Sequence, residues 1–209
     1  MKLIIFGATG GTGHQLVTQA IEKGHDVTAF VRQPEKLDLH HHSLKVIAGD
    51  VLDVASVEQA VRGQDAVLCA LGAPAMNKKN LRAGGTKNII HAMEKNDVRR
   101  FICQSGLGCG QSHALLPFHY KYLIFPLMLR YVYADHEIQE RYVRESALDW
   151  TIARPAALTD GARTGRYWHG FTVTDKSLSI KISRADVADF MLQQLGDDLY
   201  MHKAPSISY

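Results

Sequence analysis

The chain has 209 residues, of which 46% are hydrophobic and 22% are charged, and its formal net charge is +3. This length suits a single α/β domain over residues 1–209, without a separate substrate domain. The composition is that of an ordinary globular protein, and the small, scattered positive charge argues against a nucleic-acid partner. The most apolar stretch, residues 115–132, is interrupted by prolines and charged residues, so we expect no membrane span.

The three cysteines, Cys69, Cys103 and Cys109, are an odd number without metal-ligand spacing. Cys69 and Cys103 lie in apolar runs, so we expect buried, reduced thiols. Together with a first strand that begins at the N-terminus without a signal peptide, reduced thiols predict a cytoplasmic protein.

A strand, a glycine-rich turn and a helix open the chain. Residues 2–6 form an apolar run, residues 14–23 have helical spacing of apolar side chains, and Gly7, Gly10 and Gly13 stand before the helix. Such glycines permit a sharp turn, the approach of a pyrophosphate to the backbone, and close packing of helix on strand. The pattern predicts a dinucleotide cofactor, since a purely structural turn accounts for one glycine but not for three in register.

The second predicted strand, residues 26–31, ends at Arg32, and Lys36 follows one short turn later. At this strand end an acidic residue binds a free ribose 2′-hydroxyl, whereas an Arg accommodates a 2′-phosphate. Arg32 and Lys36 therefore favour NADP(H) over NAD(H). The alternative is that Arg32 is an ordinary solvated charge after a strand.

The third predicted strand, residues 44–48, precedes Asp50 and Val51. In a doubly wound sheet this strand end faces the adenine, where Asp50 could accept from the exocyclic amine and the Val51 amide could donate to a ring nitrogen. Asp50 could instead cap the next helix, although Asp53 is the better cap candidate. The three adjacent histidines at positions 40–42 are interpreted as a solvated loop, and we assign no metal site.

The remaining pattern continues the alternation of strands and helices. Strands are predicted at 66–70, 100–103 and 150–153, and helices at 53–61, 80–95 and 127–144. This predicts a Rossmann-like, doubly wound parallel α/β sheet in the order 3-2-1-4-5-6, with helices on both faces. Leu71 and Gly72 follow the fourth strand, where a glycine lets a cofactor pass close to the backbone. A last helix, residues 184–195, starts from Ser183, and a short apolar tail surrounds Ile207.

Residues 106–130 and 156–182 are expected to form the loops on the substrate side. The first of these follows the fifth strand and joins glycines to an apolar segment. An apolar lid there would suit a flat aromatic substrate. Packing of the same segment into the core is an equally good interpretation.

The candidate chemistry depends on the absence of a catalytic Tyr–Lys pair and on the presence of two polar residues. Alcohol-oxidising short-chain dehydrogenases use a Tyr whose pKa is lowered by a Lys four residues later, and no Tyr here has that Lys. A conjugated acceptor such as a flavin needs less from the protein, because its own ring delocalises the charge. Ser105 and His136 are the candidate catalytic residues. His136 stands between two acids, so a surface position is its alternative, and Cys109 lacks an evident partner for nucleophilic catalysis.

Several motifs together resemble the atypical short-chain dehydrogenase/reductase family. They are the turn at 7–13, Val31-Arg32, Gly49-Asp50-Val51, the stretch 63–67, Leu71-Gly72 and Arg144-Glu145-Ser146. Within this family the chain is similar to the biliverdin-IXβ reductase/flavin reductase branch and to bacterial NAD(P)H-binding, NmrA-like proteins.

The resemblance implies roles for a set of cofactor-binding residues. The pyrophosphate would be wrapped by Gly7, Thr9, Gly10, Gly11 and Thr12. The rest of the cofactor would meet a second group, which is Arg32, Lys36, Asp50, Val51, Leu71, Gly72, Ser105 and Pro155. Ser105 and His136 match polar positions of the reductase pocket.

We therefore expect a cytoplasmic, monomeric NADPH-dependent reductase whose partner is a small planar substrate such as a flavin. The alternative is a non-catalytic NADP(H)-binding, redox-sensing regulator, which the missing Tyr–Lys pair would also suit.

Overall fold

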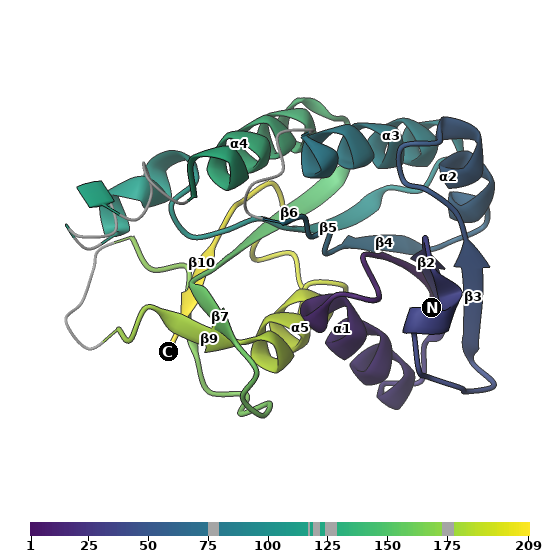
Figure 1. Ribbon diagram of the computed structural model, residues 1–209, viewed down its shortest axis with the longest axis horizontal. Helices are drawn as coiled ribbons and strands as arrows, with labels where there is room; N and C mark the ends of the chain where they lie inside the picture. The colour runs from purple at the N-terminus through teal and green to yellow at the C-terminus, as the bar shows by residue number, and fades with distance from the viewer. Residues whose placement is uncertain (75–79, 117, 119–121, 124–128, 173–177) are drawn as a thin grey trace.

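A central sheet runs through the computed structural model, which describes residues 1–74, 80–116, 118, 122–123, 129–172 and 178–209. Its strand order is β3-β2-β1-β4-β5-β6-β10-β8 (Figure 1). The strands are β1 (Lys2–Phe6), β2 (Asp26–Val31), β3 (Leu44–Ala48), β4 (Ala66–Cys69), β5 (Arg100–Gln104), β6 (Asp149–Pro155), β8 (Trp168–His169) and β10 (Ser206–Ser208). The six strands from β3 to β6 pair in parallel, in the order that the sequence predicted.

Alternation within β1 shows why the sheet is covered on both faces. Leu3 and Ile5 pack into one core cluster, while Ile4 and Phe6 pack into another. All four side chains are fully buried, as expected for a parallel strand with apolar residues on both faces.

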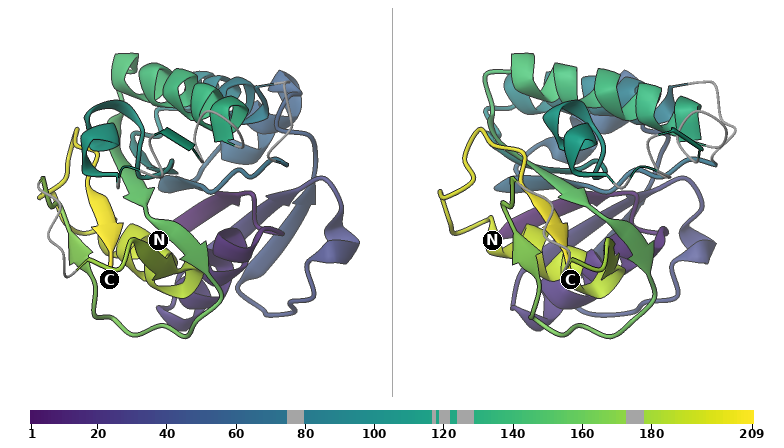
Figure 2. Two further views of the ribbon diagram at one scale, coloured as in Figure 1. Left: turned by 60° about the vertical axis from the view of Figure 1, so that its left-hand side comes forward. Right: turned by 90° about the vertical axis from the view of Figure 1, so that its left-hand side faces the viewer.

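Helices α1 (Gly11–Glu22) and α5 (Arg184–Gln193) cover one face of the sheet. Helices α2 (Val54–Val61), α3 (Leu81–Lys95) and α4 (Arg130–Glu145) cover the other, giving three layers in Figures 1 and 2. Short 3₁₀ turns occur at η1 (Pro34–Lys36) and η2 (Gly110–Leu115). The doubly wound fold is therefore confirmed.

Most predicted helix and strand ends differ from the observed ones by one or two residues. Two caps are confirmed, because the Asp53 side chain accepts from the Ala55 N–H and Ser183 accepts from the Asp186 N–H. Helix α1 begins at Gly11 rather than at position 14, so the glycine turn itself supplies its first turn. The predicted start of the long helix at 127 lies outside the described residues.

The C-terminal tail forms part of the sheet, which the sequence pattern did not predict. β10 pairs in parallel with β6 and antiparallel with β8. A separate two-stranded sheet joins β7 (Ala157–Thr159) to β9 (Lys181–Ser183) in parallel. Ile207, within β10, is fully buried. Short strands with few apolar residues carry almost no periodic signal, which is why these were missed.

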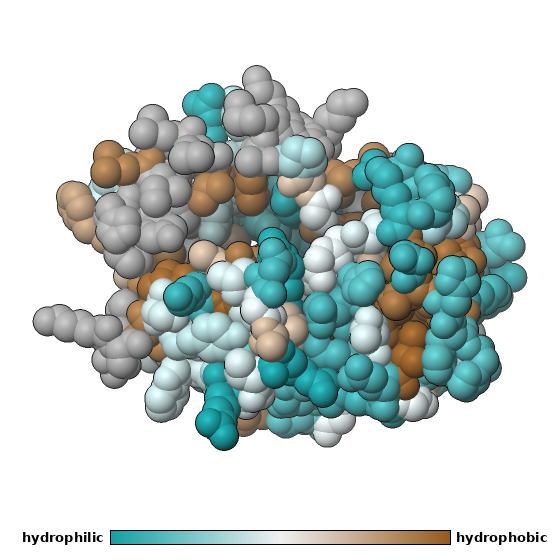
Figure 3. All heavy atoms as spheres, turned by 60° about the horizontal axis from the view of Figure 1, so that its bottom comes forward, coloured by the Kyte–Doolittle hydropathy of each residue, from teal (hydrophilic) through white to brown (hydrophobic). Residues whose placement is uncertain are grey.

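The surface is mostly polar on the face that Figure 3 shows, where hydrophobic atoms gather in a few separate areas. Among the helices of the described residues, none is long and apolar enough to cross a membrane.

Candidate functional site

The candidate site lies where β1 meets β4, because the order of the strands reverses there. The chain leaves β1 through Gly7, whose φ of +83° favours glycine, and the Gly10 N–H donates to the Gly7 carbonyl oxygen at 2.9 Å. Helix α1 follows immediately, with Gly10 at its N-cap. Glycine has no side chain to accept from the first N–H groups of the helix, so they are available to an anion.

A smaller cavity of about 290 Å³ lies on the β2 side of this turn. Its walls come from the carboxyl ends of β1, β2 and β3 and from the segment after β4. The predicted residues among its lining are Gly7, Thr9, Gly10, Arg32, Val51, Leu71 and Gly72.

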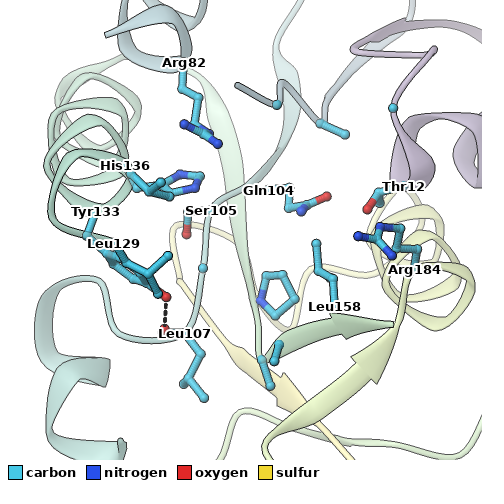
Figure 4. Close-up of a pocket in the computed structure, with 18 of the residues that line it drawn as sticks. Thr12, Arg82, Gln104, Ser105, Leu107, Leu129, Tyr133, His136, Leu158 and Arg184 are labelled. Atoms are coloured by element: carbon cyan, nitrogen blue, oxygen red, sulfur yellow. Dashed lines mark hydrogen bonds between the residues drawn. The ribbon is translucent and has the colours of Figure 1, made fainter. Parts of the chain in front are cut away.

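A larger cavity of about 390 Å³ lies on the β5 side, and Figure 4 shows the side chains around it. Its predicted lining residues are Gly10, Gly11, Thr12, Leu71, Gly72, Ser105, His136 and Pro155. Both predicted substrate-side segments also reach it, through Leu107 and Leu116 from the first and Leu158 and Ile180 from the second. Parts of those segments, residues 117, 119–121, 124–128 and 173–177, lie outside the described residues.

The two cavities share three residues, Gly10, Leu71 and Gly72. Apart from its two neighbours in the chain, no described residue has a heavy atom within 4 Å of the position that a Cβ of Gly72 would take. The backbone is therefore open where the cavities meet, and together they form one groove across the carboxyl ends of the strands. This is the place at which doubly wound folds bind their ligands.

Two predicted cofactor residues lie apart from the lining of both cavities. Lys36 is exposed at the end of η1. Asp50 is also exposed, and its Oδ1 accepts from the Leu52 N–H at 2.9 Å, so its side chain stabilises the turn after β3. Their roles towards a 2′-phosphate and an adenine stay predictions.

Ser105 is held by a buried ion pair. Its Oγ donates to Glu140 Oε1 at 2.7 Å, and Arg154 binds the same carboxylate through Nη2 at 2.6 Å and Nε at 2.8 Å. Burial by itself would raise the pKa of Glu140, but the hydrogen bonds and charge of Arg154, assisted by the Ser105 hydroxyl, lower it below its usual value. Glu140 is therefore ionised at neutral pH.

His136 is buried, so the surface position considered for it is wrong. It is only 8% exposed, and its Nδ1 lies 2.8 Å from Gln139 Oε1. Burial lowers the pKa of His136 to about 4, and the nearby charge of Arg82 adds to this effect. Arg82 is itself held by Asp135, which accepts from both its guanidinium and its backbone N–H.

Sequence reasoning missed several of the residues that build the site. Glu140 was detectable, since it follows His136 by four positions and therefore shares its helix face. Arg154 and Arg184 carried no such signal. Arg184, which pairs with Asp160 at 2.5 Å, lines the larger cavity and packs over Gly11, where an added Cβ would overlap it.

Cys69 and Cys103 are buried and free, as predicted, and Cys109 is buried and free as well. Burial raises the pKa of Cys109 far above its usual value, with the carboxylates of Glu140 and Glu137 adding to the effect. A thiol that stays protonated is a poor nucleophile.

A family model described as NAD(P)H-binding matches residues 7–198 of the chain. Among curated proteins, the chain is 30% identical over 177 residues to a chloroplastic protein of Arabidopsis thaliana, covering 78% of this chain and 61% of that protein. It is 27% identical over 165 residues to the photosystem II assembly factor Ycf39 of Synechocystis, covering 77% of this chain and 46% of the factor. The chain thus spans about half the length of these two curated relatives.

Solved structures share the fold over almost the whole chain. The oxidoreductase ylbE of Lactococcus lactis has a TM-score of 0.83 and 25% identity, covering 99% of this chain and 90% of that one. The anaerobilin reductase ChuY of Escherichia coli O157:H7 has a TM-score of 0.80 and 24% identity, with 99% and 96% covered. A short-chain dehydrogenase/reductase of Veillonella parvula in complex with NADP has a TM-score of 0.81 and 21% identity, with 100% and 94% covered.

Proposed function

The chain belongs to the NAD(P)H-binding family, and we propose that it is an NADPH-dependent reductase that transfers a hydride to a flavin or a similar planar, conjugated acceptor. Family membership makes the protein NAD(P)H-binding and agrees with its resemblance to atypical short-chain dehydrogenases. Its activity as an oxidoreductase belongs to the proposal. The preference for NADPH and the nature of the acceptor belong to the proposal.

The single observation that supports it most is the groove made by the two cavities. Its midpoint, at Gly10, Leu71 and Gly72, lies beside the N-terminus of α1, where a pyrophosphate is bound by N–H groups and the helix dipole. An adenosine half then fits the smaller cavity and a nicotinamide half the larger one. The residues present therefore fit a dinucleotide.

Arg32 supports a preference for NADPH. Its exposed side chain lines the smaller cavity at the end of β2, and within the described residues it makes no ion pair. An Arg in this position can bind a 2′-phosphate through two parallel hydrogen bonds.

The larger cavity supports a planar, apolar acceptor. When bound, the cofactor supplies a hydride from its reduced nicotinamide ring. Leu107, Leu116 and Leu158 line this cavity and provide apolar contacts for a flat ring. Ser105 and His136, labelled in Figure 4, provide polar contacts. The contribution of the protein is then chiefly one of orientation.

Stopped-flow mixing tests the proposal. NADPH-loaded protein is mixed with FMN, riboflavin or a quinone, and the absorbance of the reduced nicotinamide is followed. We expect bleaching whose rate saturates with acceptor concentration for at least one of them. A flat trace for all three, despite tight NADPH binding, would contradict a reductase and favour the NADP(H)-sensing regulator.

A further inference from the structure

The hydroxyl proton of Ser105 is already used within the protein. It is donated to Glu140 Oε1 at 2.7 Å, and an ionised carboxylate only accepts hydrogen bonds. Glu140 is held in that form by Arg154, which is 1% exposed and contacts both of its oxygens. Ser105 lines the larger cavity, so what its oxygen offers there is a lone pair.

The proton of His136 is assigned by a chain of neighbours. Gln139 uses its amide NH₂ group to donate to Thr86 Oγ1 at 3.0 Å and to Cys103 Sγ at 3.3 Å. Its Oε1 is therefore an acceptor, and the His136 Nδ1 at 2.8 Å must carry the proton. In the neutral ring the other nitrogen, Nε2, then carries a lone pair, and it has no hydrogen-bond partner among the described residues.

Tyr133 also lines the larger cavity, and its hydroxyl proton is likewise donated within the protein. The Tyr133 hydroxyl donates to the Leu107 carbonyl oxygen at 2.7 Å, drawn as a dashed line in Figure 4. Tyr133 and His136 come from α4 and Ser105 from the end of β5, and all three line the larger cavity. Ser105, Tyr133 and the Nδ1 of His136 thus have their protons committed within the protein, whereas Arg82 and Arg184 provide hydrogen-bond donors elsewhere in the lining.

We propose that Ser105 Oγ and His136 Nε2 act as paired hydrogen-bond acceptors and bind a planar N–H donor group in the larger cavity. This deepens the proposed function, on which it rests, by stating the polarity of the ligand group. A ligand carbonyl or carboxylate in the same place would face lone pairs and lose its hydrogen bonds. Two sources have the required chemistry: the carboxamide NH₂ of the nicotinamide and an imide N–H of the acceptor.

Two pairs of ligands test the proposal and separate these sources. NADP⁺ is compared with its 3-acetylpyridine analogue, in which a methyl group replaces the carboxamide NH₂. Lumiflavin is compared with its N3-methyl derivative, which lacks the imide N–H. Dissociation constants are measured by calorimetric or fluorescence titration of the whole protein, without turnover.

We expect about tenfold weaker binding of the ligand without the donor in at least one of the two pairs, because a buried acceptor is left unpaired. In Ser105→Ala or His136→Phe the corresponding ratio should shrink. Ser146→Ala is the matched control, because its hydroxyl bonds the Val143 carbonyl oxygen at the end of α4 and lies outside the lining of the cavity. It should keep the wild-type ratio.

Equal binding within both pairs by the wild-type protein would overturn the proposal, and that measurement requires no variant to fold. A ratio that persists in both Ser105→Ala and His136→Phe would overturn the assignment to these residues. Failure of the reductase function is distinguishable, since it would leave the binding ratios intact while stopped-flow traces stayed flat.

Discussion

Arg32 carries a positive charge that no ion pair within the described residues compensates. It lines the smaller cavity and is exposed, and no carboxylate of the described part of the chain pairs with it. A cation left unpaired at the end of β2 is available to a phosphate at little cost, because no internal ion pair must break first.

Replacing Arg32 with Asp should weaken NADPH binding by about 1–3 kcal/mol, the size of a lost charge-assisted interaction. Binding of NADH should not weaken, since it has no 2′-phosphate. Titrations with both cofactors measure the two affinities. Arg62→Asp makes the same charge change at an exposed residue outside both cavities and is the control. Equal losses in the two variants would show a general charge effect instead of a phosphate contact.

At the scale of elements, the join between β1 and α1 depends on close backbone packing. A Cβ added to Gly13 would overlap the Gly7 carbonyl oxygen, and a Cβ on Gly7 would overlap the Ala70 carbonyl oxygen after β4. The first turn of α1 therefore packs tightly against Gly7. Gly7 packs just as tightly against the backbone after β4. Backbone atoms cannot move aside as a flexible side chain can.

Gly13→Ala should destabilise the protein by about 1–3 kcal/mol through overpacking. Because relief requires α1 to shift from the turn, NADPH binding should weaken as well. Urea denaturation and cofactor titration measure the two effects. The control is Gly196→Ala, where no heavy atom of the described residues, other than those of its two neighbours in the chain, lies within 4 Å of the added Cβ. Wild-type stability in Gly13→Ala would contradict the close packing.

The contact between α4 and β6 includes a buried ion pair that also holds Ser105 in place. Glu140 on α4 and Arg154 on β6 form a buried pair, with side chains 5% and 2% exposed. Such pairs often add little net stability, yet losing one partner leaves a costly unpaired charge. Here the pair also orients the Ser105 hydroxyl. The packing of α4 on β6 therefore affects which hydrogen-bonding groups face the cavity.

At the scale of the whole molecule, acid should weaken the fold because His136 is buried in its neutral form. Its pKa is about 4 in the folded protein, whereas an unfolded chain has the ordinary value of 6.5. The unfolded state therefore binds the extra proton first as the pH falls. The contribution of His136 is complete above pH 6.5 and is lost towards pH 4.

The free energy of unfolding should thus fall by about 3 kcal/mol at most between pH 6.5 and pH 4 on account of this residue. Urea denaturation across that range measures the change, with His136→Phe as the comparison. The variant should show a shallower pH dependence in the same window. Glu140, whose pKa is lowered, adds a further loss only at more acidic pH, below its ordinary value of 4.5. Parallel pH profiles of the two proteins would contradict a neutral, buried His136.

Local patterns in the sequence by themselves determined the doubly wound fold and the part of the groove that the glycine turn and Arg32 line. Strands β1 to β6 were predictable from short apolar runs. The sharp turn before α1 was predictable from the spacing of the glycines at 7, 10 and 13. The position of Arg32 beside the smaller cavity was predictable because it depends only on its place directly after a strand. Its binding of a 2′-phosphate stays a prediction. Each of these signals involves residues close together in the chain.

Only the tertiary structure decided the polar wall and the ends of the sheet. Ser105, Glu140 and Arg154 meet because β5, α4 and β6 pack together, and His136 is buried because α4 lies against the sheet. β10 gains its place by pairing with β6, which lies far away in the sequence. Burial and proton state depend on neighbours brought together by folding, and no periodicity along the chain records them.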